Sequence, residues 1–205
     1  MQVEQFKVEK TTRYYSLGDI ESANKLLFVL HGYGQLPQFF IRKFQTLVEK
    51  GYFIVAPEGL HRFYLEGTSG RVGASWMTKE ARLDDIEDNI LYLKLLTEYF
   101  INIKHFKNVS ILGFSQGGAT ATRFYAKHFH FFDTCILWAS VFPDDISFLP
   151  TEKDLNYQFV IGTEDPYFSK ETIVNLLTEY KKNGIKTHQF IGNHNIDVEM
   201  LNELF

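Results

Sequence analysis

Short apolar runs alternate with longer amphipathic stretches along most of this chain. Runs without polar interruption are typical of strands that are buried on both faces of a sheet. They predict strands at residues 26–30, 52–56, 109–112, 134–140 and 159–161. Apolar residues at helical spacing predict helices at Pro37–Lys50, Glu80–Phe100, 119–128 and Glu171–Asn183. This alternation predicts an α/β fold, with a mostly parallel central sheet and helices on both of its faces.

The ends of the chain and one internal segment add to this picture. Met1–Val8 alternates apolar and polar residues, which predicts an edge strand paired antiparallel with Arg13–Leu17. Lys186–Ile191 predicts the last strand, and Asn195–Phe205 a short amphipathic helix. Glu58–Lys79 contains four glycines and predicts a long irregular loop, which we expect to act as a lid or pocket wall.

Composition limits the classes of function. The chain has 205 residues, 45% of them hydrophobic and 22% charged, which predicts one soluble domain over residues 1–205 without a separate lid domain. A net charge of −4 argues against a nucleic-acid partner and against a polybasic membrane patch. The polar N-terminal segment is unlike a signal peptide, and no apolar run reaches the ~18 residues of a membrane span, so we expect no stable membrane insertion. With a single cysteine, Cys135, these features predict a cytoplasmic protein; a homodimer stays open.

One motif predicts a nucleophile. Gly113–Gly117 reads Gly-Phe-Ser-Gln-Gly, a G-x-S-x-G pattern between a predicted strand and a predicted helix. Such a turn holds its serine, Ser115, in a strained backbone conformation that costs about 1–3 kcal/mol. The start of the helix and its free N–H groups favour an anion that develops there.

A nucleophilic serine requires a base, and the base requires an orienting acid. Asp165 and His194 each follow a predicted strand, and the carboxyl ends of parallel strands collect catalytic groups at one edge of a sheet. The chain order Ser115, Asp165, His194 is that of an α/β-hydrolase. Glu164 is the alternative acid; we favour Asp165 because an aspartate before proline fits a stiff turn.

Two backbone N–H groups are candidates for an oxyanion hole. One belongs to Gln116, directly after the nucleophile, and the other to Tyr33, in the glycine-rich turn that follows an early strand. Aromatic residues are candidates to line an apolar acyl pocket: Tyr33, Trp76, Phe114, Tyr167 and Phe168. For Trp76, packing in the core is an equally good interpretation.

Taken together, these motifs resemble the phospholipase/carboxylesterase branch of the α/β-hydrolases, which includes the acyl-protein thioesterases. The resemblance extends from about residue 25 to the end of the chain and is carried by residues 30–34, 113–118, 162–166 and 192–194. It implies that Ser115 is the nucleophile, Asp165 the acid and His194 the base, with Tyr33 and Gln116 at the oxyanion positions. The chain departs from the family in having Gln35 where an acidic residue is frequent, Asn193 where glycine is common, and Tyr167-Phe168-Ser169 after Asp165-Pro166.

The sequence therefore predicts a carboxylesterase-type serine hydrolase. We expect it to cleave carboxylic esters or thioesters of short to medium acyl chains through an acyl-enzyme on Ser115, with a small-molecule ester as its partner and no cofactor or metal. One alternative is an activity like that of acyl-protein thioesterases or lysophospholipases. The other is a catalytically inactive binding module of the same fold, which would be expected to lack a member of the triad.

Overall fold

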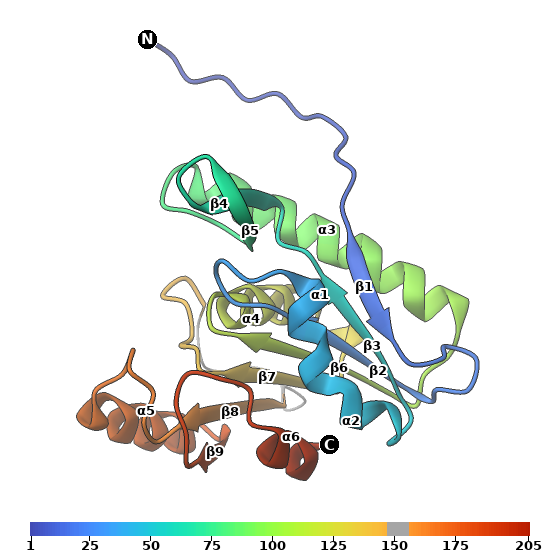
Figure 1. Cartoon of the computed structure of the whole chain (residues 1–205), viewed down its shortest axis with the longest axis vertical. Helices are drawn as coiled ribbons and strands as arrows, with labels where there is room; N and C mark the ends of the chain where they lie inside the picture. The colour runs from blue at the N-terminus through green and yellow to red at the C-terminus, as the bar shows by residue number, and fades with distance from the viewer. Residues whose placement is uncertain (147–155) are drawn as a thin grey trace.

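The apolar runs form a seven-stranded sheet in a computed structural model that describes residues 1–146 and 156–205 (Figure 1). The spatial order of the strands is β1-β3-β2-β6-β7-β8-β9. Their bounds are β1 Tyr14–Leu17, β2 Lys25–Leu30, β3 Tyr52–Pro57, β6 Asn108–Phe114, β7 Thr134–Trp138, β8 Tyr157–Gly162 and β9 Lys186–Phe190. Neighbouring strands are parallel except for β1, which runs antiparallel to β3. The predicted α/β fold with its mostly parallel sheet is confirmed.

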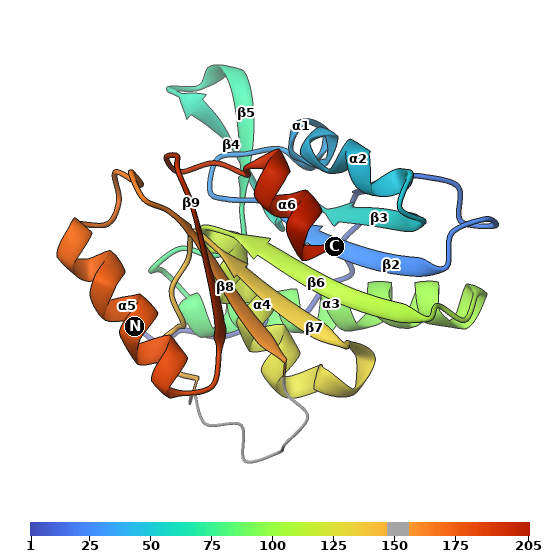
Figure 2. The same cartoon turned by 90° about the horizontal axis from the view of Figure 1, so that it is seen from below.

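Helices cover both faces of this sheet (Figure 2). One face carries α1 Pro37–Phe40, η1 Ile41–Phe44, α2 Gln45–Val48 and α6 Val198–Leu204, and the other α3 Arg82–Ile103, α4 Gln116–His128 and α5 Lys170–Lys182; a short η2 Phe129–Phe131 follows α4. Alternate residues of β2 supply the two cores, because successive side chains of a strand point to opposite faces. Leu27 and Val29 pack on the α1–α2 side, whereas Leu26 and Phe28 pack on the α3–α4 side.

Most predicted elements are present, with small shifts at their ends. The helix expected at Pro37–Lys50 is interrupted by the 3₁₀ segment η1 and ends before Gly51, whose φ of 82° lies in the left-handed region that favours glycine. Helix α3 extends beyond the predicted end, to Ile103. The strand expected at residues 159–161 is β8, which begins two residues earlier, at Tyr157, and ends at Gly162.

The N-terminal strand β1 pairs with a different segment from the one predicted. Met1–Val8 is exposed and forms no strand, whereas β1 pairs antiparallel with β3, with Tyr14 opposite Pro57 and Leu17 opposite Ile54. Alternation alone predicts an edge strand at Met1–Val8, but a stable strand also requires that its apolar side chains are buried against the sheet. The apolar side chains Val3, Phe6 and Val8 remain exposed, and among the described residues no strand pairs with the outer edge of β1.

The long loop expected at Glu58–Lys79 is largely a β-hairpin. Strands β4 His61–Glu66 and β5 Ser69–Ser75 pair antiparallel around a turn at Gly67, whose φ is 56°. Hydrogen bonds from Gly34 N to Ala74 O (2.9 Å) and from Ala74 N to Gln35 O (3.1 Å) tie β5 to the turn after β2. The hairpin is largely exposed, so it lacks the apolar alternation of a half-buried strand pair.

Within the described residues, no helix is both long enough and apolar enough to cross a lipid bilayer.

Candidate functional site

Ser115 occupies a strained turn between β6 and α4. Its φ of 52° and ψ of −121° lie outside the regions that serine ordinarily adopts. The turn is held by hydrogen bonds from Ser115 N to Trp138 O (2.9 Å) and from Gly118 N to Ser115 O (2.9 Å). A Cβ at Gly113 would overlap the Gly117 carbonyl oxygen, so only glycine allows the strand end and helix start to approach this closely. The geometry is the one that the G-x-S-x-G pattern predicts.

Asp165 and His194 are hydrogen-bonded to each other. Asp165 Oδ2 lies 2.7 Å from His194 Nδ1, and Asp165 Oδ1 accepts a hydrogen bond from Tyr167 N at 3.0 Å. The Asp165 carboxylate is fully buried, whereas Glu164 is exposed. Because a carboxylate accepts at Nδ1, the neutral imidazole carries its proton there, and Nε2 remains as the basic nitrogen. The structure therefore brings Asp165, and not Glu164, to His194.

The loops that carry this pair are packed directly on each other. Glu164 N donates to Gly192 O at 2.8 Å, and Trp138 Nε1 donates to Asn195 O at 2.8 Å. The His194 ring lies 4.8 Å from the Phe114 ring and 4.5 Å from the Tyr167 ring, measured between centroids. Contacts from β6 and from the loop after β8 thus fix the orientation of the imidazole.

Ser115 and His194 line one cavity of about 440 Å³, which we call the Ser115 cavity. Of the predicted pocket aromatics, Tyr167 and Phe168 line it. Phe114 is buried behind His194, and the Tyr33 side chain is 61% exposed and packs on Phe63 outside the cavity.

Trp76 is part of the core, which corrects its assignment to the pocket. Its side chain is fully buried, its ring packs on His31 at 5.2 Å, and its Nε1 donates to His31 O at 2.8 Å. The indole N–H thus finds its partner inside the protein, as buried tryptophans require.

The turn after β2 lies against the nucleophile. A Cβ placed on Gly32 would lie 3.3 Å from Ser115 Cβ. Three N–H groups of this turn already have hydrogen-bond acceptors within the protein. Gly32 N donates to Gln35 Oε1, Gly34 N donates to Ala74 O, and Gln35 N donates to Gly32 O. Among the described residues, the N–H groups of Tyr33 and Gln116 have no such acceptor. These are the two groups that the sequence predicts for an oxyanion hole.

Sequence reasoning did not find the role of the Gln116 side chain. Gln116 Oε1 accepts from Trp76 N at 3.0 Å and from Ser75 Oγ at 3.2 Å, while Nε2 donates to Met77 O at 2.8 Å. The amide therefore attaches the segment after β5 to the start of α4. Its position directly after the nucleophile was the only signal for it in the sequence.

An ion pair between the buried Arg123 and the partly exposed Asp145, at the Ser115 cavity, was also missed. Arg123 is 3% exposed and donates from Nε and Nη2 to Asp145, at 2.8 Å and 2.6 Å. The hydrogen bonds from Arg123 lower the pKa of Asp145 to about 2. Because Val141–Asp144 forms part of the cavity wall, this pair anchors the wall to α4. The two residues are 22 positions apart, and no local pattern in the sequence connects them.

His31 has a structural role and is not a member of the triad. Its Nε2 accepts from Gly59 N at 3.0 Å, and its Nδ1–H donates to Gly32 O at 2.8 Å. Burial lowers the pKa of His31 to about 4, so the ring is neutral at pH 7. The neutral ring ties the turn after β2 to the segment after β3.

We expect His31 to make the free energy of unfolding depend on pH. Between pH 6.5 and about 4 the unfolded chain binds a proton at this histidine while the folded chain does not, so stability falls as the pH falls. Acidification from pH 7 to 4 should lower the free energy of unfolding by about 3 kcal/mol more in the wild type than in His31→Gln. Urea unfolding at both pH values measures this difference.

The exposed His105 provides the control, since His105→Gln should keep the wild-type pH dependence. An equal loss of stability in wild type and His31→Gln would contradict the buried, neutral state of His31.

Among residues 1–146 and 156–205, no group of three or more His, Cys, Asp or Glu residues is placed to hold a metal ion.

Comparison with known proteins places these features in a family. The family model described as "Serine hydrolase (FSH1)" matches residues 20–197. No curated protein sequence matches the chain significantly. Among solved structures, a Bacillus cereus carboxylesterase matches with a TM-score of 0.70 and 16% identity, over 94% of this chain and 92% of that one.

Two further solved structures show the same fold. A carboxylesterase from Mesorhizobium loti matches with a TM-score of 0.71 and 15% identity, over 94% of this chain and 93% of its own. Zea mays acyl-protein thioesterase 2 matches with a TM-score of 0.69 and 15% identity, over 95% of this chain and 96% of its own. The resemblance to the α/β-hydrolases that the sequence motifs indicate is thereby confirmed.

Proposed function

The chain belongs to the serine hydrolase (FSH1) family, and from this premise we propose that it cleaves carboxylic esters or thioesters through an acyl-enzyme on Ser115. One observation carries the proposal. His194, which is hydrogen-bonded to the buried Asp165, lines the same cavity as Ser115, and Ser115 has the strained backbone of a nucleophile turn.

Each residue of the triad has a defined step in the proposed reaction. His194 Nε2 takes the proton of Ser115 as Oγ bonds to the carbonyl carbon of the substrate. Asp165 holds the imidazole and stabilises its cation. The imidazolium then gives its proton to the leaving alcohol or thiol as the C–O or C–S bond breaks. Water repeats the sequence on the acyl-enzyme, with His194 as base, and releases the acid.

The negative charge that develops on the carbonyl oxygen requires hydrogen-bond donors that are not already bonded to acceptors within the protein. The N–H groups of Tyr33 and Gln116 meet this condition, and we assign them to the oxyanion hole. Loss of one such donor typically lowers kcat by about 10²–10³-fold.

The dimensions of the Ser115 cavity support short to medium acyl chains in a small-molecule ester. Its volume of about 440 Å³ is at the low end of the range of small-molecule sites. Phe142, Tyr167 and Phe168 contribute aromatic surface to its wall, whereas Arg82, Arg123 and Asp144 make another part of the wall polar. A long acyl chain would have to extend beyond this cavity.

A series of p-nitrophenyl esters from acetate to palmitate tests this assignment. Each added methylene that is buried contributes about 0.8 kcal/mol, or about 4-fold in kcat/KM, until the cavity is full. We expect kcat/KM to be highest between butyrate and octanoate and to fall for palmitate. A maximum at palmitate would contradict the assignment of short to medium chains, and faster turnover of an S-acylated peptide thioester would favour a thioesterase.

A further inference from the structure

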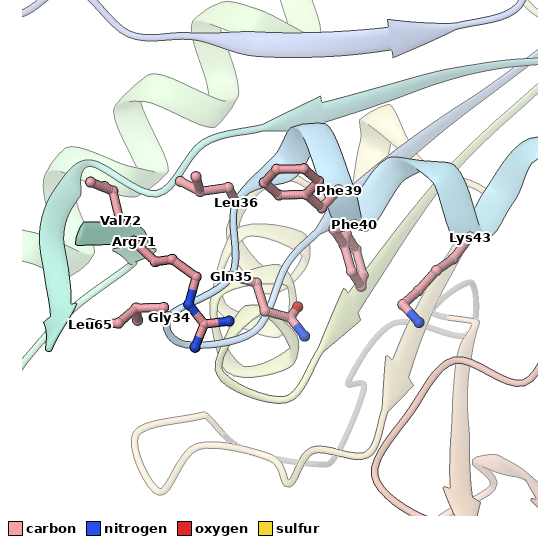
Figure 3. Close-up of a pocket in the computed structure, with 9 residues that line it drawn as sticks. All are labelled: Gly34, Gln35, Leu36, Phe39, Phe40, Lys43, Leu65, Arg71 and Val72. Carbon is pink, nitrogen blue, oxygen red and sulfur yellow. The ribbon is translucent and has the colours of Figure 1, made fainter.

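We propose that a second pocket beside the turn after β2 binds an anionic group of the substrate, an inference that rests on the proposed function. This pocket has a volume of about 560 Å³ and lies between that turn, the helical segment at α1 and η1, and the β4–β5 hairpin (Figure 3). We call it the hairpin pocket. It is formed by different residues from the Ser115 cavity.

The hairpin pocket has an apolar part that is open to a ligand. Phe39 and Leu65, which come from α1 and β4, are 57% and 39% exposed although they are large apolar side chains. Phe40 is buried beneath them, and Val72 contributes from β5. Apolar side chains exposed together within a concave site are typical of ligand contact.

Two cations border this apolar surface. The Lys43 ammonium and the Arg71 guanidinium lie on the same side of the pocket as the Gln35 amide (Figure 3). None of the described residues that line the pocket is acidic, and the nearest carboxylate to Arg71 is that of the exposed Glu66, at 3.6 Å. The chain as a whole carries a net charge of −4, so this local positive charge opposes the overall charge. An apolar surface with two cations at its border matches an amphipathic anion.

The hairpin pocket adjoins the site of reaction. Gln35 lines it and accepts the Gly32 N–H at 2.9 Å, and Gly32 is packed against Ser115. Phe40, also in its wall, packs on Phe114 at 5.9 Å, and Phe114 packs on His194 at 4.8 Å. The hairpin pocket is therefore a near neighbour of the triad, and a substrate arm that enters it has to pass over the turn at residues 32–35.

The sheet topology puts the two hollows on either side of the nucleophile. Most of the Ser115 cavity is built from segments that follow β6, β7, β8 and β9, with Met77 and Arg82 added from the segment after β5, whereas the hairpin pocket is built from the segment that follows β2 and from the β4–β5 hairpin. An ester whose carbonyl lies at Ser115 extends in two directions, one for the acyl group and one for the alcohol. We infer that one arm enters the Ser115 cavity and that the other carries a carboxylate or a phosphate-type group into the hairpin pocket.

A binding experiment tests the hairpin pocket independently of turnover. Calorimetry with Ser115→Ala would compare monoethyl adipate with the uncharged ethyl hexanoate, and a phosphonate analogue of the adipate ester would distinguish the two kinds of anion. We expect monoethyl adipate or its phosphonate to bind about 10-fold more tightly than ethyl hexanoate, because of the positive charges of Lys43 and Arg71 in a partly exposed pocket. The further substitutions Lys43→Gln and Arg71→Gln should remove this preference.

A matched control carries the same change of charge at a distant site. Lys181→Gln with Lys182→Gln, at the end of α5, should leave the preference intact. About 0.5 M NaCl should weaken it in the unmodified pocket, because exposed charges are screened. Equal binding of charged and uncharged esters, or an equal loss in the α5 control, would overturn the proposal.

Steady-state kinetics of the wild type and of Lys43→Gln/Arg71→Gln distinguish a failure of the hairpin-pocket proposal from a failure of the proposed esterase function. Hydrolysis of both esters, with the ratio of their kcat/KM values decreased about 10-fold in Lys43→Gln/Arg71→Gln, supports both proposals. Hydrolysis with an unchanged ratio overturns the hairpin pocket alone. Absence of any hydrolysis overturns the esterase function, and the calorimetry then decides the hairpin pocket by itself.

Discussion

Replacing Ser115 by alanine should lower kcat for ester hydrolysis by about 10⁶-fold, a loss typical of enzymes that depend on a serine nucleophile. In the proposed reaction Ser115 Oγ is the atom that bonds to the carbonyl carbon, so no other group can take over the step. The backbone turn is held by Trp138 O and Gly118 N, which the substitution leaves in place. Steady-state hydrolysis of p-nitrophenyl butyrate measures the effect.

Ser110→Ala is the matched control for this substitution. Ser110 lies on β6, in the strand that leads into the motif, and its hydroxyl bonds to Asn108 Oδ1 at 2.9 Å, away from the triad. We expect its kcat to remain within a few-fold of the wild type. Wild-type turnover by a folded Ser115→Ala protein would eliminate Ser115 as the nucleophile.

Replacing Asp165 by asparagine should lower kcat by about 10⁴-fold. Asp165 Oδ1 accepts the Tyr167 N–H, and an asparagine oxygen can keep that bond. The amide nitrogen would then face His194 Nδ1, which would have to accept, so the imidazole proton would move to Nε2. A protonated Nε2 cannot take the proton of Ser115.

Glu164→Gln separates the two candidate acids, because it neutralises the neighbouring carboxylate. Glu164 is exposed, and it contacts the His194 loop through its backbone N–H, which the substitution leaves in place. The kcat of Glu164→Gln should therefore be close to that of the wild type. The opposite pattern, with activity lost in Glu164→Gln and kept in Asp165→Asn, would show that the acid has been assigned wrongly.

The triad could be inferred from the sequence because its members are marked by local patterns. Continuous apolar runs identify strands buried on both faces, and Ser115, Asp165 and His194 each follow such a run or a shorter strand at its carboxyl end. Parallel pairing then brings these ends together without further information. The rule requires only the order of elements, which short-range periodicity supplies.

Other features depend on contacts that no local pattern records. The β4–β5 hairpin is largely exposed, so the alternation that marks a strand is absent and its glycines resemble those of a loop. Met1–Val8 has the alternation of a strand, but its apolar side chains bury no surface against the sheet. Trp76 packs on His31, 45 positions away, and Arg123 pairs with Asp145 across a cavity wall. Each of these depends on which segments are adjacent in space.

The central claim is that Ser115 is activated by His194, and labelling with a fluorophosphonate probe tests it most directly. Intact mass and peptide mapping should show a single adduct on Ser115 in the wild type and none in a folded His194→Ala variant. The absence of an adduct on folded wild-type protein, or equal labelling of His194→Ala, would contradict an assembled triad and favour a binding module.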